Sequence, residues 1–209
     1  MHRFKLFKTT LAAAVVAFSV SYAYAEEFSA RLNGFNEIGS IPSGATYVQS
    51  YTGAILTAAT GTLSLDLDTK HQMATYTLTF TGPFSSAVQQ AHIHFGKSRD
   101  SGGIVVWLCQ TAAKPAPIAS TPFCGMNLTP DPGVTVPVSG TFTAANVLAV
   151  PGQNVPAGVF DAIAEAITSH TAYVNIHTAN FPGGEIRGQL HGEDRDDHHD
   201  DHDHHDQHH

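Results

Sequence analysis

Basic residues are scarce in this chain. Ten Lys and Arg stand against 18 Asp and Glu, which gives a formal net charge of −8 at pH 7 with histidine neutral. Proteins that bind nucleic acid use clustered Lys and Arg to neutralise the phosphates. Because no such cluster is visible, we expect no nucleic-acid partner.

Signatures of common enzymes are also missing. The chain contains neither a Gly-x-Ser-x-Gly nucleophile elbow nor a glycine-rich phosphate-binding loop. The sequence therefore gives no indication of a serine hydrolase or a nucleotide-dependent enzyme.

Long apolar runs are absent too. The best candidate, 11–20, follows a basic start and is followed by Ala23-Tyr24-Ala25. This order is typical of a secretory signal peptide with a small-x-small cleavage site, so we expect 1–25 to be removed. The run is shorter than the roughly 18 residues that a membrane span needs. We therefore expect a secreted or periplasmic protein that has no membrane attachment after cleavage.

Cysteine occurs only twice, as Cys109 and Cys124. Neither CxxC spacing nor a nearby histidine supports a thiolate metal site or a redox pair. Export to an oxidising compartment favours a disulfide between them. Closing a loop of about 15 residues contributes roughly 3 kcal/mol in the chain-entropy model. The enclosed segment contains several prolines and no strand or helix period, so we expect the bridge to be structural.

Alternation of apolar and polar residues dominates the rest of the chain. The segments 61–68 and 72–80 both alternate, and the turn between them predicts a hairpin. Further strands are expected at 27–32, 88–95, 103–109, 138–142, 172–178 and 184–191. Short strands separated by Gly and Pro predict an all-β fold, an antiparallel Greek-key-like β-sandwich.

One segment, 159–169, follows the helical period instead. Its apolar residues fall on one stripe: Phe160, Ile163, Ala164 and Ile167. This pattern predicts one short amphipathic helix that covers an end of the sandwich. His170 follows it directly, and we expect it to satisfy carbonyl groups at the helix C-terminus and not to bind a metal.

Three histidines lie in two of the expected strands. Residues i and i+2 of a strand share a face, so His92 and His94 point the same way, as do Asn175 and His177. If the two strands come close, His92, His94 and His177 form a three-imidazole set with an open fourth position, which suits zinc or copper. The alternative is that these imidazoles hydrogen-bond to the backbone at strand ends and bind nothing.

The last expected hairpin brings other polar groups to the same place. A tight turn after Thr178 would set His177 opposite Glu185 and Asn175 opposite Arg187. In that register we expect Glu185, Asn175 and Arg187 to surround the ligands, with Glu185 accepting the second ring proton of a histidine. The alternative is an ion pair of Glu185 with Arg187, or across the strands, that simply closes the sandwich.

The final 17 residues have no apolar member and contain eight acids, one Arg and seven histidines. Such a segment cannot bury a core, so we expect a single domain over 26–192 and a disordered tail over 193–209. Mixed imidazole and carboxylate groups suit low-specificity binding of divalent transition metal ions. The alternatives are a purification tag, a solvating tail or a pH-dependent charge switch. The tail ligands would be His198, His199, His202, His204, His205, His208 and His209.

Two stretches resemble the signature segments of the CHRD domain, a module named after chordin and found in many secreted bacterial proteins. They are AHIHFGKSRDSGGIVVWLC and AYVNIHTANFPGGEIRGQL. The second is the more specific, and its matching residues are Tyr173, Asn175, His177, Thr178, Pro182, Gly184, Glu185, Ile186, Arg187, Gly188 and Gln189. The resemblance covers about 28–190. The sequence departs from the family pattern in two ways. Near its start only Leu32, Gly34 and Glu37 of the pattern remain, and the segments 39–55 and 109–136 look like insertions.

These features together predict an exported CHRD-type protein that binds copper or zinc through His92, His94 and His177 and collects further ions with its tail. A copper-dependent oxidoreductase acting on superoxide is an alternative, because HxH on a strand of an exported β-sandwich is similar to the copper site of copper/zinc superoxide dismutases. No bridging histidine with a zinc subsite is evident, unless His71 or the tail supplies it. The resemblance to chordin also implies an extracellular interaction module with an unknown protein partner. Fold alone does not decide among these.

Metal uptake by the tail should depend on pH, because only neutral imidazole ligates a metal. With an ordinary histidine pKa of about 6.5, we expect the tail to take up several Ni²⁺ ions at pH 7.5 and far fewer at pH 5.5. Titration calorimetry of the full chain, compared with a variant whose seven tail histidines are replaced by asparagine, measures this uptake. Equal uptake by the two chains at pH 7.5 would contradict a metal-collecting role.

Overall fold

The computed structural model describes residues 25–38 and 53–192. Nearly all of the predicted signal peptide, the tail and most of the expected insertion 39–55 lie outside these residues. Within the described ranges, no helix has the length and apolar character that crossing a membrane requires.

Within residues 25–38 and 53–192, nine β-strands form one continuous antiparallel sheet, whose main path runs β5-β4-β7-β8-β1-β2-β3-β6. The prediction of an all-β fold is confirmed. The strands are β1 (Glu26–Asn33), β2 (Thr60–Asp68), β3 (Met73–Thr81), β4 (Val88–Phe95), β5 (Gly103–Cys109), β6 (Thr135–Thr143), β7 (Ala172–Thr178), β8 (Ile186–Gln189) and β9 (His191–Gly192), which pairs with β1. Three short 3₁₀ helices, η1 (Gly34–Asn36), η2 (Ala144–Asn146) and η3 (Pro151–Gln153), lie in the connections.

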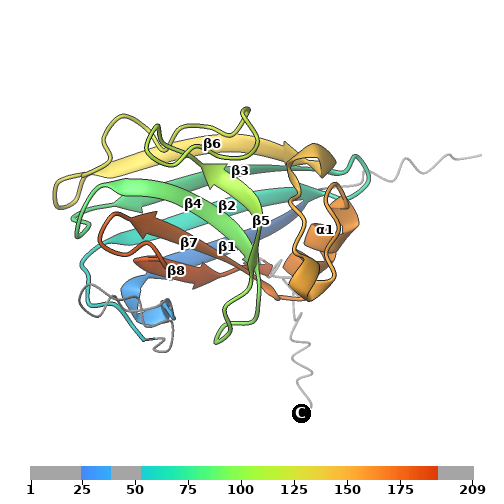
Figure 1. The fold of residues 1–209 in the computed structure, drawn as a ribbon, viewed down its shortest axis with the longest axis horizontal. Helices are drawn as coiled ribbons and strands as arrows, with labels where there is room; N and C mark the ends of the chain where they lie inside the picture. Colours follow the sequence, from blue (N-terminus) through green and yellow to red (C-terminus); the bar gives the residue numbers. More distant parts are fainter. Residues whose placement is uncertain (1–24, 39–52, 193–209) are drawn as a thin grey trace, which may run out of the picture.

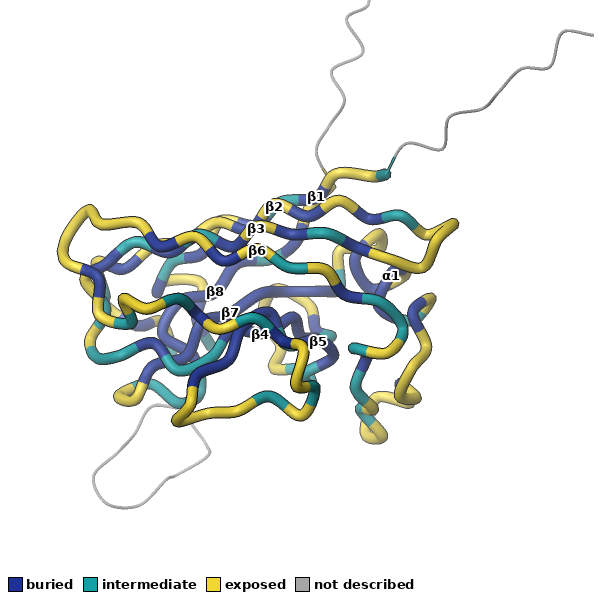
Figure 2. Tube along the Cα trace, turned by 90° about the horizontal axis from the view of Figure 1, so that it is seen from above, coloured by how far each residue is buried: buried dark blue, intermediate teal, exposed yellow. Residues whose placement is uncertain are grey.

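The sheet folds over into two layers, which Figure 2 shows edge-on: β6, β3, β2 and β1 lie over β8, β7, β4 and β5. The layers join where β1 meets β8, which pair through Asn33 and Arg187. Three predicted strands, 88–95, 103–109 and 172–178, have the predicted bounds. The expected strand 184–191 is instead divided into β8 and β9, because Leu190 bonds to Ala172 of β7 while His191 pairs with Ser29 of β1.

The core fills the space between the layers. Alternate residues of β2 point inward, and Leu63, Leu65 and Leu67 are each 1% exposed. In the opposite layer Ile93 and Ile176 are fully buried. Full burial of such a side chain contributes roughly 1.5–3 kcal/mol. Because side chains alternate along a strand, the neighbours of Ile93 and Ile176 in β4 and β7 face away from this core.

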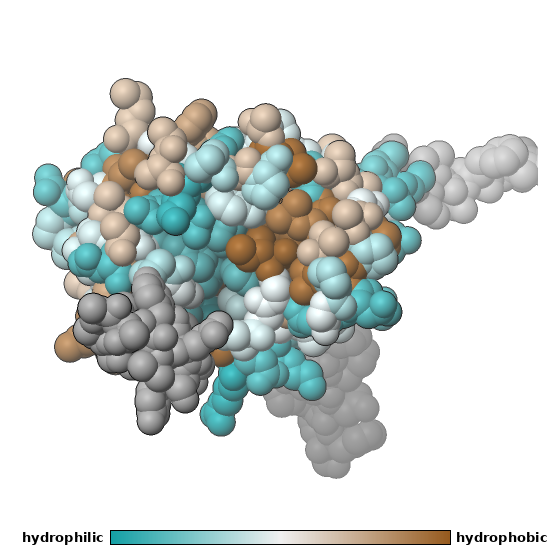
Figure 3. All heavy atoms as spheres, in the orientation of Figure 1, coloured by the Kyte–Doolittle hydropathy of each residue, from teal (hydrophilic) through white to brown (hydrophobic). Residues whose placement is uncertain are grey.

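The helix α1 (Phe160–Thr168) covers one end of the sandwich, as predicted (Figure 1). Its buried residues include the four of the predicted stripe, and Asp161 and Glu165 are exposed. His170 follows the helix with φ of 57°, and its backbone N–H donates to the Ile167 carbonyl. Figure 3 shows hydrophobic residues gathered at the surface between β5 and α1.

Cys109 and Cys124 form the predicted disulfide, and both are fully buried. The enclosed segment wraps around Gln110, whose side-chain Oε1 accepts from Ala116 N and whose Nε2 donates to the Thr121 carbonyl. The backbone of Gln110 also bonds to Pro122 and Cys124. The bridge therefore holds a loop that contains little other regular structure onto the end of β5.

Replacing both cysteines by alanine should lower the free energy of unfolding by about 3 kcal/mol, because the unfolded chain regains the freedom of a loop of about 15 residues. Urea denaturation of the oxidised chain and of the C109A/C124A variant measures the difference. The reduced wild-type chain is the control, and we expect it to resemble the variant. Identical midpoints for oxidised and reduced chains would rule out a structural role for the bridge.

Candidate metal centre

The three predicted ligand histidines come together on the outer face of the β4–β7 layer. In the β4–β7 register, His92 lies opposite Asn175 and Gln90 lies opposite His177. The pairing places His92, His94 and His177 side by side, so that one ligand nitrogen from each lies within 4.8 Å of the others. Although they face away from the core, their exposed fractions are only 0%, 6% and 5%.

Loop carbonyl groups orient two of the three rings. His94 Nδ1 lies 2.9 Å from the carbonyl oxygen of Gly102, and His177 Nδ1 lies 3.0 Å from that of Pro182. In each ring Nδ1 is therefore engaged with the backbone, which leaves Nε2 for other contacts. His177 Nε2 lies 3.0 Å from Nδ1 of His92. The Nε2 atoms of His92 and His94 are buried and have no hydrogen-bond partner among the described residues.

Aromatic rings hold two of the histidines in place from the sides. The His92 ring meets Trp107 of β5 edge-on, with centroids 4.3 Å apart. The His94 ring stacks on Tyr173 of β7, with centroids 4.7 Å apart and an interplanar angle of 7°. Trp107 lies opposite His92, and Tyr173 lies opposite His94, in the respective strand pairs. The cross-strand positions therefore explain both contacts.

Arg187 supports the site from behind Tyr173. Its guanidinium carbon lies 3.3 Å from the centroid of the Tyr173 ring, and its Nη2 donates to the carbonyls of Lys97 and Asp100. The side chain is only 1% exposed. It lies opposite Asn175 in the predicted register. Arg187 thus supports His94 through a stack of three groups: its own guanidinium, the Tyr173 ring and the His94 imidazole.

Glu185 has a different role from the predicted one. Its carboxylate accepts hydrogen bonds from the Thr57 hydroxyl, from the backbone N–H and hydroxyl of Ser85, and from the Thr178 hydroxyl. The Nδ1 of His177 faces the Pro182 carbonyl instead. The prediction that Glu185 accepts a ring proton from a ligand histidine is therefore wrong. The predicted alternative, an ion pair of Glu185, is not found among the described residues either.

Burial keeps the three imidazoles neutral. It lowers the pKa of His92 well below the usual value, and the neighbouring His177 and His94 lower it further. Burial also lowers the pKa of His177 to about 3. For His94 burial lowers the pKa to about 4, against a smaller raising effect of the Gly102 carbonyl. At neutral pH each ring therefore offers a nitrogen lone pair, which metal ligation requires.

The glycine of the last turn is needed because polar groups crowd it. Gly184 has φ of +127°, and a Cβ there would overlap Glu37 Oε2 and lie 2.7 Å from Asn175 Nδ2. Glu37 is 2% exposed. It follows η1, and it belongs to the polar surroundings of the site together with Trp107 and Tyr173. Sequence reasoning did not assign these three residues to the site, although the cross-strand partners of the histidines were a usable signal for the two aromatic residues.

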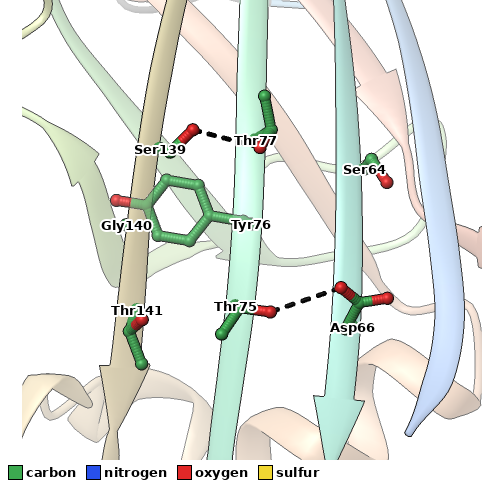
Figure 4. A pocket seen from close by; sticks show the side chains of 8 residues that line it. All are labelled: Ser64, Asp66, Thr75, Tyr76, Thr77, Ser139, Gly140 and Thr141. Carbon is green, nitrogen blue, oxygen red and sulfur yellow. Dashed lines mark hydrogen bonds between the residues drawn. The ribbon is translucent and has the colours of Figure 1, made fainter.

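Other polar features of the described residues lie elsewhere. The hollow in Figure 4 lies on β2, β3 and β6 of the other layer and is lined mainly by hydroxyl groups, with Asp66 as its acid. His71 pairs with Asp68 at the turn between β2 and β3. His71 does not join the histidine cluster, so within the described residues it supplies no second metal subsite.

Comparison with known proteins identifies one relationship. A family model described as the CHRD domain matches residues 28–190, which include every strand that forms the site. No curated protein and no solved structure matches the chain.

The metal-free protein should lose stability in mild acid. Burial lowers the folded-state pKa to about 3 for His177 and about 4 for His94, whereas the unfolded value is 6.5. At any pH between these values, such a histidine is neutral in the folded state and takes up a proton on unfolding. The unfolded state binds more protons in this window, so the free energy of unfolding falls as pH falls from 6.5, by about 1.4 kcal/mol per pH unit for each histidine. Urea denaturation with a chelator at pH 7, 6 and 5 measures the slope. The variant H94Q should show a flatter slope, and an unchanged slope would contradict the assignment.

Proposed function

The chain belongs to the CHRD domain family, and from this premise we propose that it is an exported protein that binds one copper or zinc ion through His92, His94 and His177. In this proposal 1–25 is a cleaved signal peptide, and 26–192 is the metal-binding domain. The family and the disulfide support an extracellular or periplasmic location, since disulfides persist in oxidising compartments.

The convergence of three neutral, buried imidazoles is the observation that supports the metal site best. Two nitrogens bound at 2.0–2.1 Å to one ion at the tetrahedral angle lie about 3.3 Å apart. The separation of 3.0 Å between His92 Nδ1 and His177 Nε2 is close to that value. Burying polar atoms without partners is unfavourable, and the buried Nε2 of His94 is such an atom. Ligation would satisfy it.

Binding without turnover fits this site better than redox catalysis does. A copper oxidoreductase needs a coordination position that a small substrate can reach, whereas the three histidines are at most 6% exposed. Neutral imidazole ligands, held by backbone carbonyls and aromatic rings, suit retention of an ion. We propose that the histidine- and aspartate-rich tail, 193–209, collects ions from dilute solution and that the domain retains one.

Metal analysis separates the domain from the tail. In the full chain with all seven tail histidines replaced by asparagine, we expect one copper or zinc ion per chain after dialysis. Further replacement of His92, His94 or His177 by glutamine should weaken binding at least tenfold, because a ligand is lost. The exposed histidine variant H71Q is the matched control and should bind as tightly as its parent. Absence of bound ion in the tail variant, or equal affinity after loss of His177, would refute the site.

A further inference from the structure

Asn175 lies at the centre of the site, in a position that the three-histidine description leaves unexplained. It is 2% exposed, in the middle of β7, with His92 opposite it on β4 and Arg187 opposite it on β8. Its side-chain Oδ1 lies 2.8 Å from Nε2 of His177. His92 Nδ1 lies 3.0 Å from the same Nε2. Two potential donor atoms, Asn175 Oδ1 and His92 Nδ1, therefore both lie within 3.0 Å of a third, His177 Nε2.

The surroundings of Asn175 fix the direction of its amide. Nδ2 lies 3.5 Å from the carbonyl of Gly183, and Nδ2 and the Glu37 carboxylate approach the same face of Gly184. An amide N–H₂ donates and an amide oxygen accepts, so the end that lies near the Gly183 carbonyl is Nδ2. Asn175 consequently presents its oxygen to the histidines.

The hydrogen atoms of a neutral His177 cannot satisfy its three contacts. A neutral imidazole carries one N–H. If the proton is on Nδ1, that N–H donates to the Pro182 carbonyl. Nε2 then carries no hydrogen atom, so Nε2 and Asn175 Oδ1 face each other as two acceptors. If the proton is on Nε2, the same conflict arises between Nδ1 and the Pro182 carbonyl. A cation bound to both Nε2 and Oδ1 removes the conflict, because both atoms then donate lone pairs to it.

We propose that Asn175 Oδ1 is the fourth ligand of the ion held by His92, His94 and His177. This inference rests on the proposed function and extends it: the site has three nitrogens and one oxygen, all from the protein. Four protein ligands are the arrangement of a closed site, whereas catalytic sites keep a position for water or substrate. The domain would then retain its ion without exposing it to small anions, and Glu37 and Arg187 would be positioning residues.

Anion access to the bound ion tests the closed site without any change in the domain. The full chain with its tail histidines replaced by asparagine is loaded with Co²⁺, whose visible absorption reports coordination number, and is titrated with azide. We expect the intense bands of a four-coordinate ion and no change with azide. In the further variant N175A a position is open, so azide should shift the spectrum.

Affinity measurements give a second, independent readout. The variant N175L keeps the size of the side chain but has no donor, and we expect it to weaken Co²⁺ and Zn²⁺ binding by 10- to 100-fold. The double variant N175D/E37Q keeps an oxygen toward the histidines and leaves the number of carboxylates near Gly184 unchanged, so it should bind at least as tightly as the parent. N36A, at an exposed asparagine, is the control and should leave affinity unchanged.

The outcomes separate the two proposals. If the parent chain binds no Co²⁺ at all, the proposed function fails. If it binds one Co²⁺ but azide shifts its spectrum, or if N175L binds as tightly as the parent, the histidine site stands and the fourth ligand is refuted. Circular dichroism identifies any variant that fails to fold, and in that case the remaining folded Asn175 variant, compared with the parent, decides.

Discussion

The pairing of β4 with β7 is the constraint on which the rest of the site depends. These strands lie in the interior of one layer, and their alternation sends Ile93 and Ile176 into the core while the histidines face outward. A shift of the pairing by one residue would move each set to the other face, so the burial of the core residues also fixes the register of the three histidines. The energy that holds the imidazoles together thus comes from apolar burial on the other side of the same strands.

The loops that cover the outer face bury charged side chains and also contribute the hydrogen bonds that these side chains need. Arg187 and Glu185 are almost fully buried, and such groups are tolerated only when they are hydrogen-bonded. The guanidinium donates to carbonyls of the loop between β4 and β5, and the Glu185 carboxylate accepts from three separate segments. The imidazoles differ, because they stay neutral and the Nε2 atoms of His92 and His94 have no hydrogen-bond partner among the described residues. That difference is what makes the histidine cluster a candidate site and the other buried polar groups part of the scaffold.

The closing segment of the chain combines both roles. Between 172 and 190 it supplies His177, the stacked Tyr173 and the central Asn175, and then Arg187 on the returning strand. The match to the CHRD family extends over this whole stretch. The outer face of the other layer carries a row of hydroxyl groups instead.

The sequence by itself determined the strands at 88–95, 103–109 and 172–178, the helix, the disulfide and the register of Asn175 with Arg187. The disulfide follows from the presence of two cysteines in a chain with a predicted export signal. Each of the other features follows from a local period, or from the alternation of side chains across a short turn. Only the tertiary structure decided what surrounds the three histidines. Glu185 meets Thr57 and Ser85, which are remote in sequence, while the Gly102 and Pro182 carbonyls take the ring nitrogens. Contacts of this kind depend on loop conformation and on the packing of distant segments, for which a periodic pattern in the sequence carries no signal.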